Sequence, residues 1–385
     1  MKGVLVVEGH VQGLSNVRSL GEQGIPVYVA DENICLAQFS KFCKKSFRCP
    51  PYKSDEFIDW LINTAEKENL QDWCIIPSND HIVQNISKNK ERIEKYYKII
   101  VPDTDILDNI VKKKNLLNKA DACGIPIPAT CYPENVNQNI DKLRFPVLIK
   151  GNEGLSFYKI TRQKAIQVDN LDDLTAKLNE LKNLNIPDEQ IMIQELIPFC
   201  KDHKVISFTA FSVNGEIKTH WSGIKIHEHP INYGTATCAQ SIFVQEILDI
   251  SIPLLKTLNY TGVCEIEYLW DKRDNQYKLI EINPRTWLWV GLAKACGINY
   301  ALMIYNFLNN KPIDFKQNYE IGTKWINYIT NIFYCSIAII KKKFTLREYF
   351  NSLKGKKVNA LRYKNDNLPA FMFVLLIFYI FKKRS

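Results

Sequence analysis

Two kinds of segment alternate in the first 104 residues. Short runs that are apolar along their whole length occur at 3–9, 25–31 and 73–80, and mixed segments with the composition of helices lie between them. Continuous apolar strands separated by helices are typical of a parallel sheet that is covered on both faces. The pattern therefore predicts an α/β domain with a Rossmann-like parallel sheet over residues 1–104.

The pattern becomes helical after this domain. One helix is predicted from 105 to Gly124, because glycine commonly follows the last turn of a helix. Two strands are predicted next, at 144–150 and 164–168, on either side of a glycine-containing segment at 151–163. That segment allows two interpretations. It is either an ordinary hairpin loop or a flexible loop in which Ser156 offers its hydroxyl and backbone N–H to phosphate.

Residues 263–287 carry the strongest chemical signal. Two strands are separated by the polar sequence DKRDNQ, which predicts a hairpin. Side chains alternate faces along a strand, so Glu265 and Glu267 share one face, Glu281 and Asn283 share another, and all four can converge in a hairpin. Mg²⁺ typically takes one or two carboxylates and leaves its other positions to water and phosphate. We therefore predict a metal site on this hairpin.

The alternative is an exposed hairpin whose charged side chains face solvent. It does not explain why an apolar strand ends in EINPR. Arg285 follows Asn283 by two residues and could place a guanidinium on a phosphoryl or carboxylate group.

Lys150 ends an apolar strand, so it is either a solvated strand end or a cation directed at nucleotide phosphates.

The positive charge lies in one part of the chain. The 385 residues carry a net charge of +9, and the segment 341–385 alone carries +10. The remainder is close to neutral, so we expect no nucleic-acid partner. The eleven cysteines are scattered singly, without a C-x-x-C pair, which argues against a disulfide framework or zinc site and fits a reducing cytoplasm.

The order and spacing of several motifs resemble the ATP-grasp superfamily. KNLLNKADACGIPIPAT (114–130) resembles its opening helix and turn, FPVLIK (145–150) its nucleotide-lysine strand, and IMIQELIPF (191–199) its adenine hinge. The hairpin resembles its metal strands. The resemblance covers roughly residues 1–310 and is strongest to the carboxylate–amine ligase branch, which includes D-aspartate ligases and carbamoyl-phosphate-synthase-like proteins.

The resemblance implies a fold and a role for each candidate site residue. It implies an ATP-grasp domain at 105–310, with a lid at about 125–195, followed by a C-terminal extension at 311–385. The residues that it implies for ATP binding are Lys114, Lys150, Ser156, Glu195, Leu196, Ile197 and Asp202. The implied metal ligands are Glu267, Glu281 and Asn283, and the implied catalytic residues are Lys225 and Arg285. The implied substrate contacts are Ser78, Asp80, Gly234 and Thr235.

The register among the three lysines at 112–114 stays open. Together the implied roles describe an ATP-dependent ligase that joins a small carboxylate to an amine through an acyl phosphate, with release of ADP and phosphate. ATP and Mg²⁺ are the expected cofactors, with Mn²⁺ as an alternative metal. An ATP-grasp carboxylase or carbamoyl-phosphate-forming enzyme is one alternative, and a nucleotide-binding membrane protein without turnover is another.

Two weaker patterns allow other interpretations. Gly9, Gly13 and Asp31 suggest a dinucleotide site, but GHVQGL does not match G-x-G-x-x-G, and a tight turn explains both glycines equally well. His227 and His229 lie two residues apart without an evident third ligand, so we interpret them as polar loop residues.

The C-terminal extension contains two apolar runs, at 326–340 and 368–381, each followed by lysines. The second run has 14 residues, against roughly 20 for a helix that spans a membrane. We expect an apolar, basic tail that lies on an anionic membrane surface, which would place a cytoplasmic protein at the inner face of the cell membrane. A helix buried against the body or against a second subunit of a homodimer is the alternative.

Overall fold

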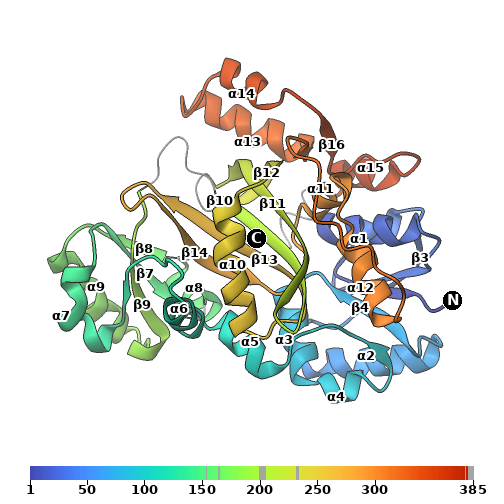
Figure 1. Cartoon of the computed structure of the whole chain (residues 1–385), viewed down its shortest axis with the longest axis horizontal. Helices are drawn as coiled ribbons and strands as arrows, with labels where there is room; N and C mark the ends of the chain where they lie inside the picture. Colours follow the sequence, from blue (N-terminus) through green and yellow to red (C-terminus); the bar gives the residue numbers. More distant parts are fainter. Residues whose placement is uncertain (153, 164, 199–204, 231–233, 378, 380–385) are drawn as a thin grey trace.

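The computed structural model describes residues 1–385 apart from 153, 164, 199–204, 231–233, 378 and 380–385, and it describes no side chain at 137 or 154–156. Its strands form three sheets (Figure 1). The central sheet lies between a small lid on one side and the N-terminal domain on the other, and the C-terminal extension runs along the remaining edge.

The N-terminal sheet is parallel, as predicted, with the order β3-β2-β1-β4-β5. Its strands are β1 (Val4–Val7), β2 (Val27–Asp31), β3 (Cys43–Arg48), β4 (Trp73–Pro77) and β5 (Tyr97–Lys98). Its helices are α1 (Val11–Gly21), η1 (Ala37–Phe39), α2 (Asp55–Lys67), α3 (Asp80–Lys88) and α4 (Lys90–Ile93). Val4 and Val6 belong to one core cluster, whereas Leu5 and Val7 belong to another on the opposite face. Both faces are therefore buried, which explains the continuous apolar run.

The helix expected from 105 to Gly124 is two helices, α5 (Thr104–Val111) and α6 (Lys113–Ala122). The chain breaks at Lys112, whose ψ of 106° is extended. The prediction of one continuous helix is therefore wrong, although Gly124, with φ of 69°, follows α6 as expected.

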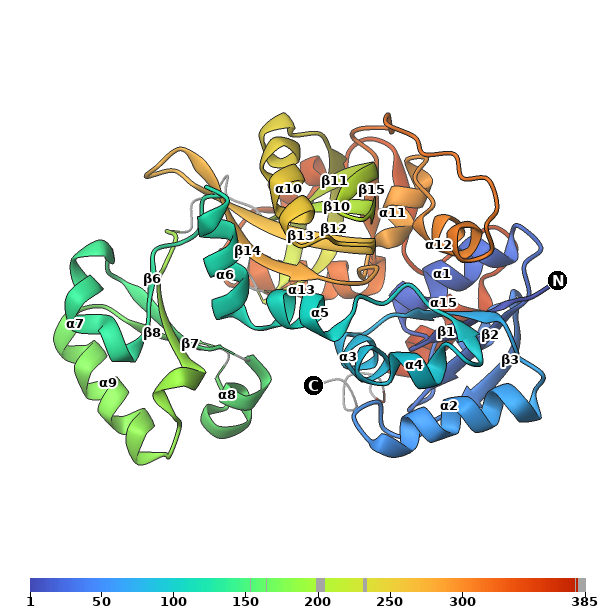
Figure 2. The same cartoon turned by 60° about the horizontal axis from the view of Figure 1, so that its bottom comes forward.

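The lid is an antiparallel sheet with the order β6-β9-β7-β8 and a core of its own. Its strands are β6 (Thr130–Cys131), β7 (Val147–Gly151), β8 (Ala165–Val168) and β9 (Ile191–Glu195). Its helices are η2 (Pro133–Asn135), α7 (Val136–Asn139), η3 (Ile140–Lys142), α8 (Gly154–Thr161), α9 (Leu171–Asn183) and η4 (Asp188–Gln190). The segment between β7 and β8 contains α8, so of its two interpretations the ordinary hairpin loop is wrong. Figure 2 shows the lid at one end of the molecule.

The central sheet has the order β14-β13-β10-β11-β12-β15-β16 and is antiparallel except between β15 and β16. Its strands are β10 (Val205–Val213), β11 (Glu216–His229), β12 (Thr235–Ile242), β13 (Gly262–Asp271), β14 (Gln276–Asn283), β15 (Lys324–Ile326) and β16 (Lys357–Asn359). Helix α10 (Gln245–Thr257) packs against β10 and β11, whereas α11 (Val290–Ala295) and α12 (Tyr300–Leu308) pack against α1. The central sheet and the N-terminal domain are therefore joined through these helices.

The C-terminal extension is part of the folded body. It adds β15 and β16 to the central sheet and contains α13 (Tyr328–Ile340), α14 (Leu346–Ser352) and α15 (Leu368–Leu375). Arg18 of α1 forms a buried ion pair with Asp366, at 2.8 Å between Nε and Oδ2. Phe373 of α15 is only 2 % exposed. The apolar run at 368–381 is thus docked on the body through much of its described part, so the expectation of a separate tail needs correction. Among the described residues, none forms a helix with the length and apolar character needed to span a membrane.

Candidate functional site

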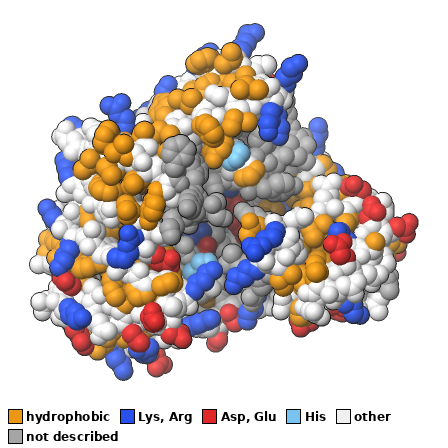
Figure 3. Space-filling view, turned by 180° about the vertical axis from the view of Figure 1, so that it is seen from behind, with side chains coloured by type: hydrophobic (Ala, Val, Ile, Leu, Met, Phe, Trp, Pro, Cys, Tyr) orange, Lys and Arg blue, Asp and Glu red, His pale blue; other side chains and the backbone are white. Residues whose placement is uncertain are grey.

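A cavity of about 580 Å³ lies where the N-terminal domain, the β13–β14 hairpin and the C-terminal extension meet. Figure 3 shows this part of the surface as a hollow with acidic side chains visible inside it. All of the catalytic, metal and substrate residues predicted from the sequence line it: Ser78, Asp80, Lys225, Gly234, Thr235, Glu267, Glu281, Asn283 and Arg285.

The two strands form the hairpin that the sequence predicted. Glu265 lies opposite Asn283, and Glu267 lies opposite Glu281. The two pairs are two residues apart along each strand, so all four side chains lie on one face. The Asn283 amide donates to Glu265 Oε2 at 3.1 Å. Two carboxylates and an amide oxygen on one rigid face form a donor set that suits a divalent cation.

The electrostatics of this face fit the same ligand. We call Glu265, Glu267 and Glu281 the cavity cluster. Burial raises the pKa of Glu265 to about 7, and the charge of Glu267 adds to the effect. Burial also raises the pKa of Glu267, although Lys225 opposes it. The negative charge is therefore only partly compensated by the protein, and a bound cation would stabilise the ionised carboxylates.

Two basic residues border the cavity cluster. Lys225 of β11 donates to Glu267 Oε1 at 2.9 Å. Arg285 binds Asp80 in bidentate fashion, with Nε–Oδ1 and Nη2–Oδ2 distances of 2.7 and 2.8 Å. Asp80 opens α3 in the N-terminal domain, whereas Arg285 follows β14, so this pair joins two domains across the cavity. The guanidinium thus already binds a carboxylate, which is the kind of group that we expect it to bind in a substrate.

The N-terminal strand ends also reach the cavity. Glu8 follows β1 with φ of 72°, and Ser78 follows the adjacent strand β4. A Cβ at Gly13 would lie 2.1 Å from the Glu8 carbonyl oxygen, so only glycine fits there. Asp31 accepts from the backbone N–H groups of Gly9 and Asn33, each at 2.8 Å. These residues therefore build a tight turn, and the dinucleotide interpretation has no support from the geometry.

Lys150 lies on β7 in the lid and donates to Gln194 Oε1 at 2.9 Å. Burial lowers its pKa to about 7, and the charge of Lys113 contributes. Lys114, the lysine favoured by the resemblance, pairs with Glu134 at 2.8 Å, whereas Lys112 pairs with Asp108 at 2.7 Å. Lys113 is therefore the member of the triplet that acts electrostatically on Lys150, which the sequence alone did not reveal.

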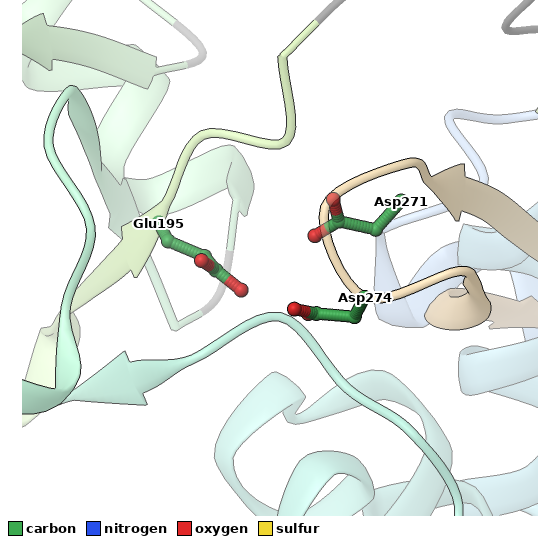
Figure 4. Close-up of side chains that lie close together, drawn as sticks. All are labelled: Glu195, Asp271 and Asp274. Carbon is green, nitrogen blue, oxygen red and sulfur yellow. The ribbon is translucent and has the colours of Figure 1, made fainter.

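Glu195 ends β9 at the predicted adenine hinge, and its side chain is completely buried. Together with Asp271 and Asp274 it forms a group of carboxylates whose oxygens lie within 4.8 Å of one another (Figure 4). We call these three residues the turn cluster, because two of them lie in the turn between β13 and β14. The cations that pair with it are Arg144, Arg273 and Lys278.

These cations determine the charge state of the turn cluster. Burial opposes ionisation of Glu195, but hydrogen bonds from Arg144 and Lys278 outweigh it and lower the pKa. The pKa of Asp271 is lowered by the same balance, through Arg273 and Lys278. The turn cluster is therefore an ion-pair network that ties the lid to the hairpin, and the Glu195 carboxylate is engaged there.

The rest of the predicted nucleotide site is described only in part. Leu196 donates its backbone N–H to Pro146 O at 3.0 Å, and Ile197 is buried. Ser156 belongs to α8, but its side chain is outside the described part of the structure, and Asp202 lies outside the described residues altogether.

His227 and His229 lie on β11, so the interpretation as loop residues is wrong. His227 stacks on Phe344 and Tyr349, and His229 stacks on Tyr334 with ring centroids 3.5 Å apart. Both rings therefore serve as packing surfaces for the C-terminal extension.

The extension contributes cavity residues that the sequence pattern did not indicate. They are Asn327, Thr330, Tyr334 and Phe373, and Trp287 of the loop after β14 lies with them on the cavity wall. For the four residues of the extension, the only signal in the sequence was the apolar character of 326–340 and 368–381, which suggested a membrane.

Comparison with known proteins supports the fold. Residues 233–305 match the family model described as carbamoyl-phosphate synthase L chain, ATP binding domain. A D-aspartate ligase from Enterococcus faecium is 21 % identical over 300 residues, which cover 74 % of this chain and 70 % of that protein. Mitochondrial acetyl-CoA carboxylase from Saccharomyces cerevisiae is 24 % identical over 263 residues, but this chain spans only 10 % of its length.

Solved structures share the overall fold of this chain. Biotin carboxylase from Campylobacter jejuni, in complex with an ATP analogue, matches with a TM-score of 0.65 and 15 % identity over 84 % of this chain and 74 % of that one. L-amino acid ligase from Bacillus licheniformis matches with a TM-score of 0.59 and 14 % identity over 82 % and 75 % of the two chains. The ATP-grasp fold that the resemblance implied is thereby confirmed.

Proposed function

We propose that this chain, which has the ATP-grasp fold, is an ATP-dependent ligase that joins a carboxylate to an amine. The observation that carries the proposal is the hairpin register, which brings Glu267, Glu281 and Asn283 onto one face beside Lys225 and Arg285. The similarity to a D-aspartate ligase and the structural match to an L-amino acid ligase favour this reaction class.

The residues on the hairpin fit a magnesium–nucleotide complex. Glu267, Glu281 and Asn283 would hold Mg²⁺, which supplies charge compensation at the phosphates when it is bound. Lys150, aided by Lys113, would bind phosphate oxygens of ATP. The backbone of 195–197 would contact adenine, and we keep Ser156 and Asp202 as further ATP candidates.

The overall reaction follows from these groups. An oxygen of the substrate carboxylate attacks the γ-phosphorus of ATP, the bond between that phosphorus and ADP breaks, and an acyl phosphate forms. The amine nitrogen then bonds to the acyl carbon, the bond from that carbon to phosphate oxygen breaks, and the nitrogen loses a proton. Lys225 and Arg285 stabilise negative charge on the transferred phosphoryl group and orient the carboxylate. Asp80 holds the guanidinium in place until the substrate carboxylate competes for it.

A carboxylase is the second candidate, because biotin carboxylase and acetyl-CoA carboxylase are among the matches. In that reaction bicarbonate would take the place of the organic acid. The two candidates therefore differ in the acid that they accept, and one assay separates them.

The test is ADP release by the purified protein across pairs of carboxylates and amines, with bicarbonate as one of the acids. We expect release that depends on both an organic acid and an amine, and that is lost in Glu281→Gln. Release that needs only bicarbonate would favour the carboxylase. No ADP release above the substrate-free rate with any pair would contradict the proposal.

We also propose that the outer face of α13 and α14 contacts an anionic membrane surface. Ile332, Phe333 and Phe350 are more than half exposed, Ile340 is 80 % exposed, and three lysines follow at 341–343. Figure 3 shows hydrophobic side chains gathered at the top of the molecule, with basic side chains at their margin. Apolar and basic groups on one face suit an interface with acidic lipids.

Removing the extension does not test this contact, because Asp366 is bonded within the body. Phe333→Ser and Phe350→Ser should instead weaken binding to phosphatidylserine vesicles without changing ADP release, and neutral vesicles serve as the control. Equal binding by the variants, or no binding by the wild type, would contradict the membrane contact.

A further inference from the structure

Three residues that line the cavity each carry a buried polar atom with no hydrogen-bond partner among the residues that the structure describes. The atoms are Ser78 Oγ, Trp287 Nε1 and Asn327 Oδ1. Their residues are 4 %, 1 % and 6 % exposed, respectively. A buried donor or acceptor without a partner costs about 1–3 kcal/mol, so three such atoms in residues of one cavity wall indicate a surface shaped for a ligand.

The indole of Trp287 is held rigidly. Its ring stacks on Trp221, with centroids 5.7 Å apart and an interplanar angle of 19°. Thr286 precedes it and accepts hydrogen bonds from Gln12 at 3.0 Å and from Asn16 at 3.1 Å through its hydroxyl oxygen. Both partners lie on α1, so the loop after β14 is fixed to the N-terminal domain, and the Trp287 N–H has a set position.

Asn327 is fixed from the other side. It links β15 to α13, and its backbone N–H donates to Thr237 O at 3.0 Å. One turn later, Asn331 donates to the Thr237 hydroxyl at 3.1 Å and contacts His227 Nδ1 at 2.9 Å. The start of α13 is thereby attached to β11 and β12, and the Asn327 oxygen is presented by a rigid element.

The chemistry of the three atoms defines a ligand. An indole N–H can only donate and an amide oxygen can only accept, whereas a serine hydroxyl can do either. The ligand must therefore present an acceptor to Trp287 and an N–H or O–H donor to Asn327. Carboxylates outnumber lysine and arginine on the cavity wall, which favours a cationic donor over an anionic one.

We propose that the C-terminal extension forms the recognition subsite for the amine substrate. The ammonium group donates to Asn327 Oδ1 before it loses its proton, and a second polar group of the amine accepts from Trp287 Nε1. Ser78 contacts either group. The chemical class is a small amine that carries a carbonyl, carboxylate or hydroxyl oxygen close to its nitrogen. Phe373, Leu288 and Tyr334 provide apolar surface for its carbon chain. This inference rests on the proposed ligase function and assigns the specificity of its second substrate.

The test compares amines that differ in one polar group. Glycinamide, glycine and ethanolamine are assayed against ethylamine, each with the carboxylate that gives the fastest ADP release. The wild type should favour at least one of the polar amines over ethylamine by about 10-fold or more in kcat/KM, because a site built for a hydrogen bond rejects an analogue that lacks it. Trp287→Phe and Asn327→Leu should each raise the KM for that amine by about 10-fold and leave the KM for ATP unchanged.

Two kinds of control separate recognition from a general loss of structure. Asn327→Asp keeps an acceptor oxygen and should retain most of the amine affinity. Trp270→Phe and Asn351→Leu change the same residue types outside the cavity and should leave both KM values unchanged.

The possible outcomes distinguish this inference from the proposed function. If the wild type releases ADP but the amine KM is the same in Trp287→Phe and Asn327→Leu, the subsite assignment is wrong and the ligase function stands. If the wild type accepts ethylamine as well as it accepts the polar amines, the ligand class is wrong. Absence of ADP release with every pair overturns both.

Discussion

The β13–β14 hairpin carries acidic residues at both of its ends, and the two ends differ in how the protein treats their charge. At the turn, Asp271 and Asp274 join Glu195 and meet three cations, which lower the pKa of the cluster members. At the other end, burial raises the pKa of Glu265 and Glu267, and Lys225 is the basic residue that forms an ion pair there. The same strands thus hold one compensated and one under-compensated cluster.

The difference shows which cluster serves the fold and which serves a ligand. Buried carboxylates that are fully paired join elements, here the lid and the central sheet. Buried carboxylates that repel one another are unfavourable in the free protein, and a cation relieves the repulsion. The cavity cluster therefore has the properties of a ligand site. The turn cluster instead connects the lid to the central sheet, although its carboxylate oxygens lie closer together than those of the cavity cluster.

The largest expected effect is on catalysis at the cavity cluster. Glu281→Gln should lower ADP release by at least about 1,000-fold, because a metal supplies several kcal/mol of charge stabilisation in such a reaction. Its melting temperature should be unchanged or higher, since the substitution removes one of several carboxylates that repel one another. Asp274→Asn is the matched change at the turn and should keep turnover within a few-fold of the wild type. Near-normal turnover in a folded Glu281→Gln protein would remove this residue from the site.

The next effect is on stability at the turn cluster. Lys278→Met should lower the free energy of unfolding by about 3 kcal/mol, because it leaves buried carboxylates with fewer partners. Lys278 is 5 % exposed in its side chain and contacts Glu195, Asp271 and Asp274. Urea unfolding measures the change. An unfolding midpoint equal to that of the wild type would mean that the turn cluster does not hold the lid in place.

A smaller effect is the uptake of a proton by Lys150 when ATP binds. Burial lowers its pKa to about 7, so the free protein holds this lysine mostly neutral at pH 8. Phosphates of bound ATP should raise the pKa again, so ATP binding at pH 8 should take up about 0.5–1 proton. The uptake should vanish below about pH 6, where the lysine is already protonated. Calorimetry in two buffers of different ionisation enthalpy measures it.

Lys150→Arg is the control, because arginine stays charged at every pH used and should show no uptake from this position. Uptake equal to that of the wild type in this variant would assign the proton to another group.

The two ends of the hairpin also differ in how far the sequence could predict them. Alternation along 263–287 was sufficient to pair Glu265 with Glu267 and Glu281 with Asn283, because the period of a strand is local information. The register of the hairpin then puts both pairs on one face. The compensation of Glu195 was not predictable in this way. Its cations come from residues 144, 273 and 278, and only the folded chain brings them together.

The C-terminal extension shows the same limit more strongly. Two apolar runs next to lysines look like a membrane segment, and nothing local reveals the Arg18–Asp366 pair or the pairing of β15 with β12. The break of the helix at Lys112 had no glycine or proline to indicate it. Contacts across more than 300 residues decide whether an apolar run faces lipid, solvent or a substrate cavity.

Titration of Mn²⁺ by electron paramagnetic resonance, with ADP present, tests most directly whether the cavity cluster is the metal–nucleotide site. The wild type and Asp274→Asn should each bind Mn²⁺ tightly in an ADP-dependent manner, whereas Glu281→Gln should bind it at least about 100-fold more weakly, a loss beyond the 10–100-fold typical of outer-shell changes. Equal Mn²⁺ affinity in Glu281→Gln, or a loss confined to Asp274→Asn, would contradict the assignment and place the metal at the turn cluster or elsewhere.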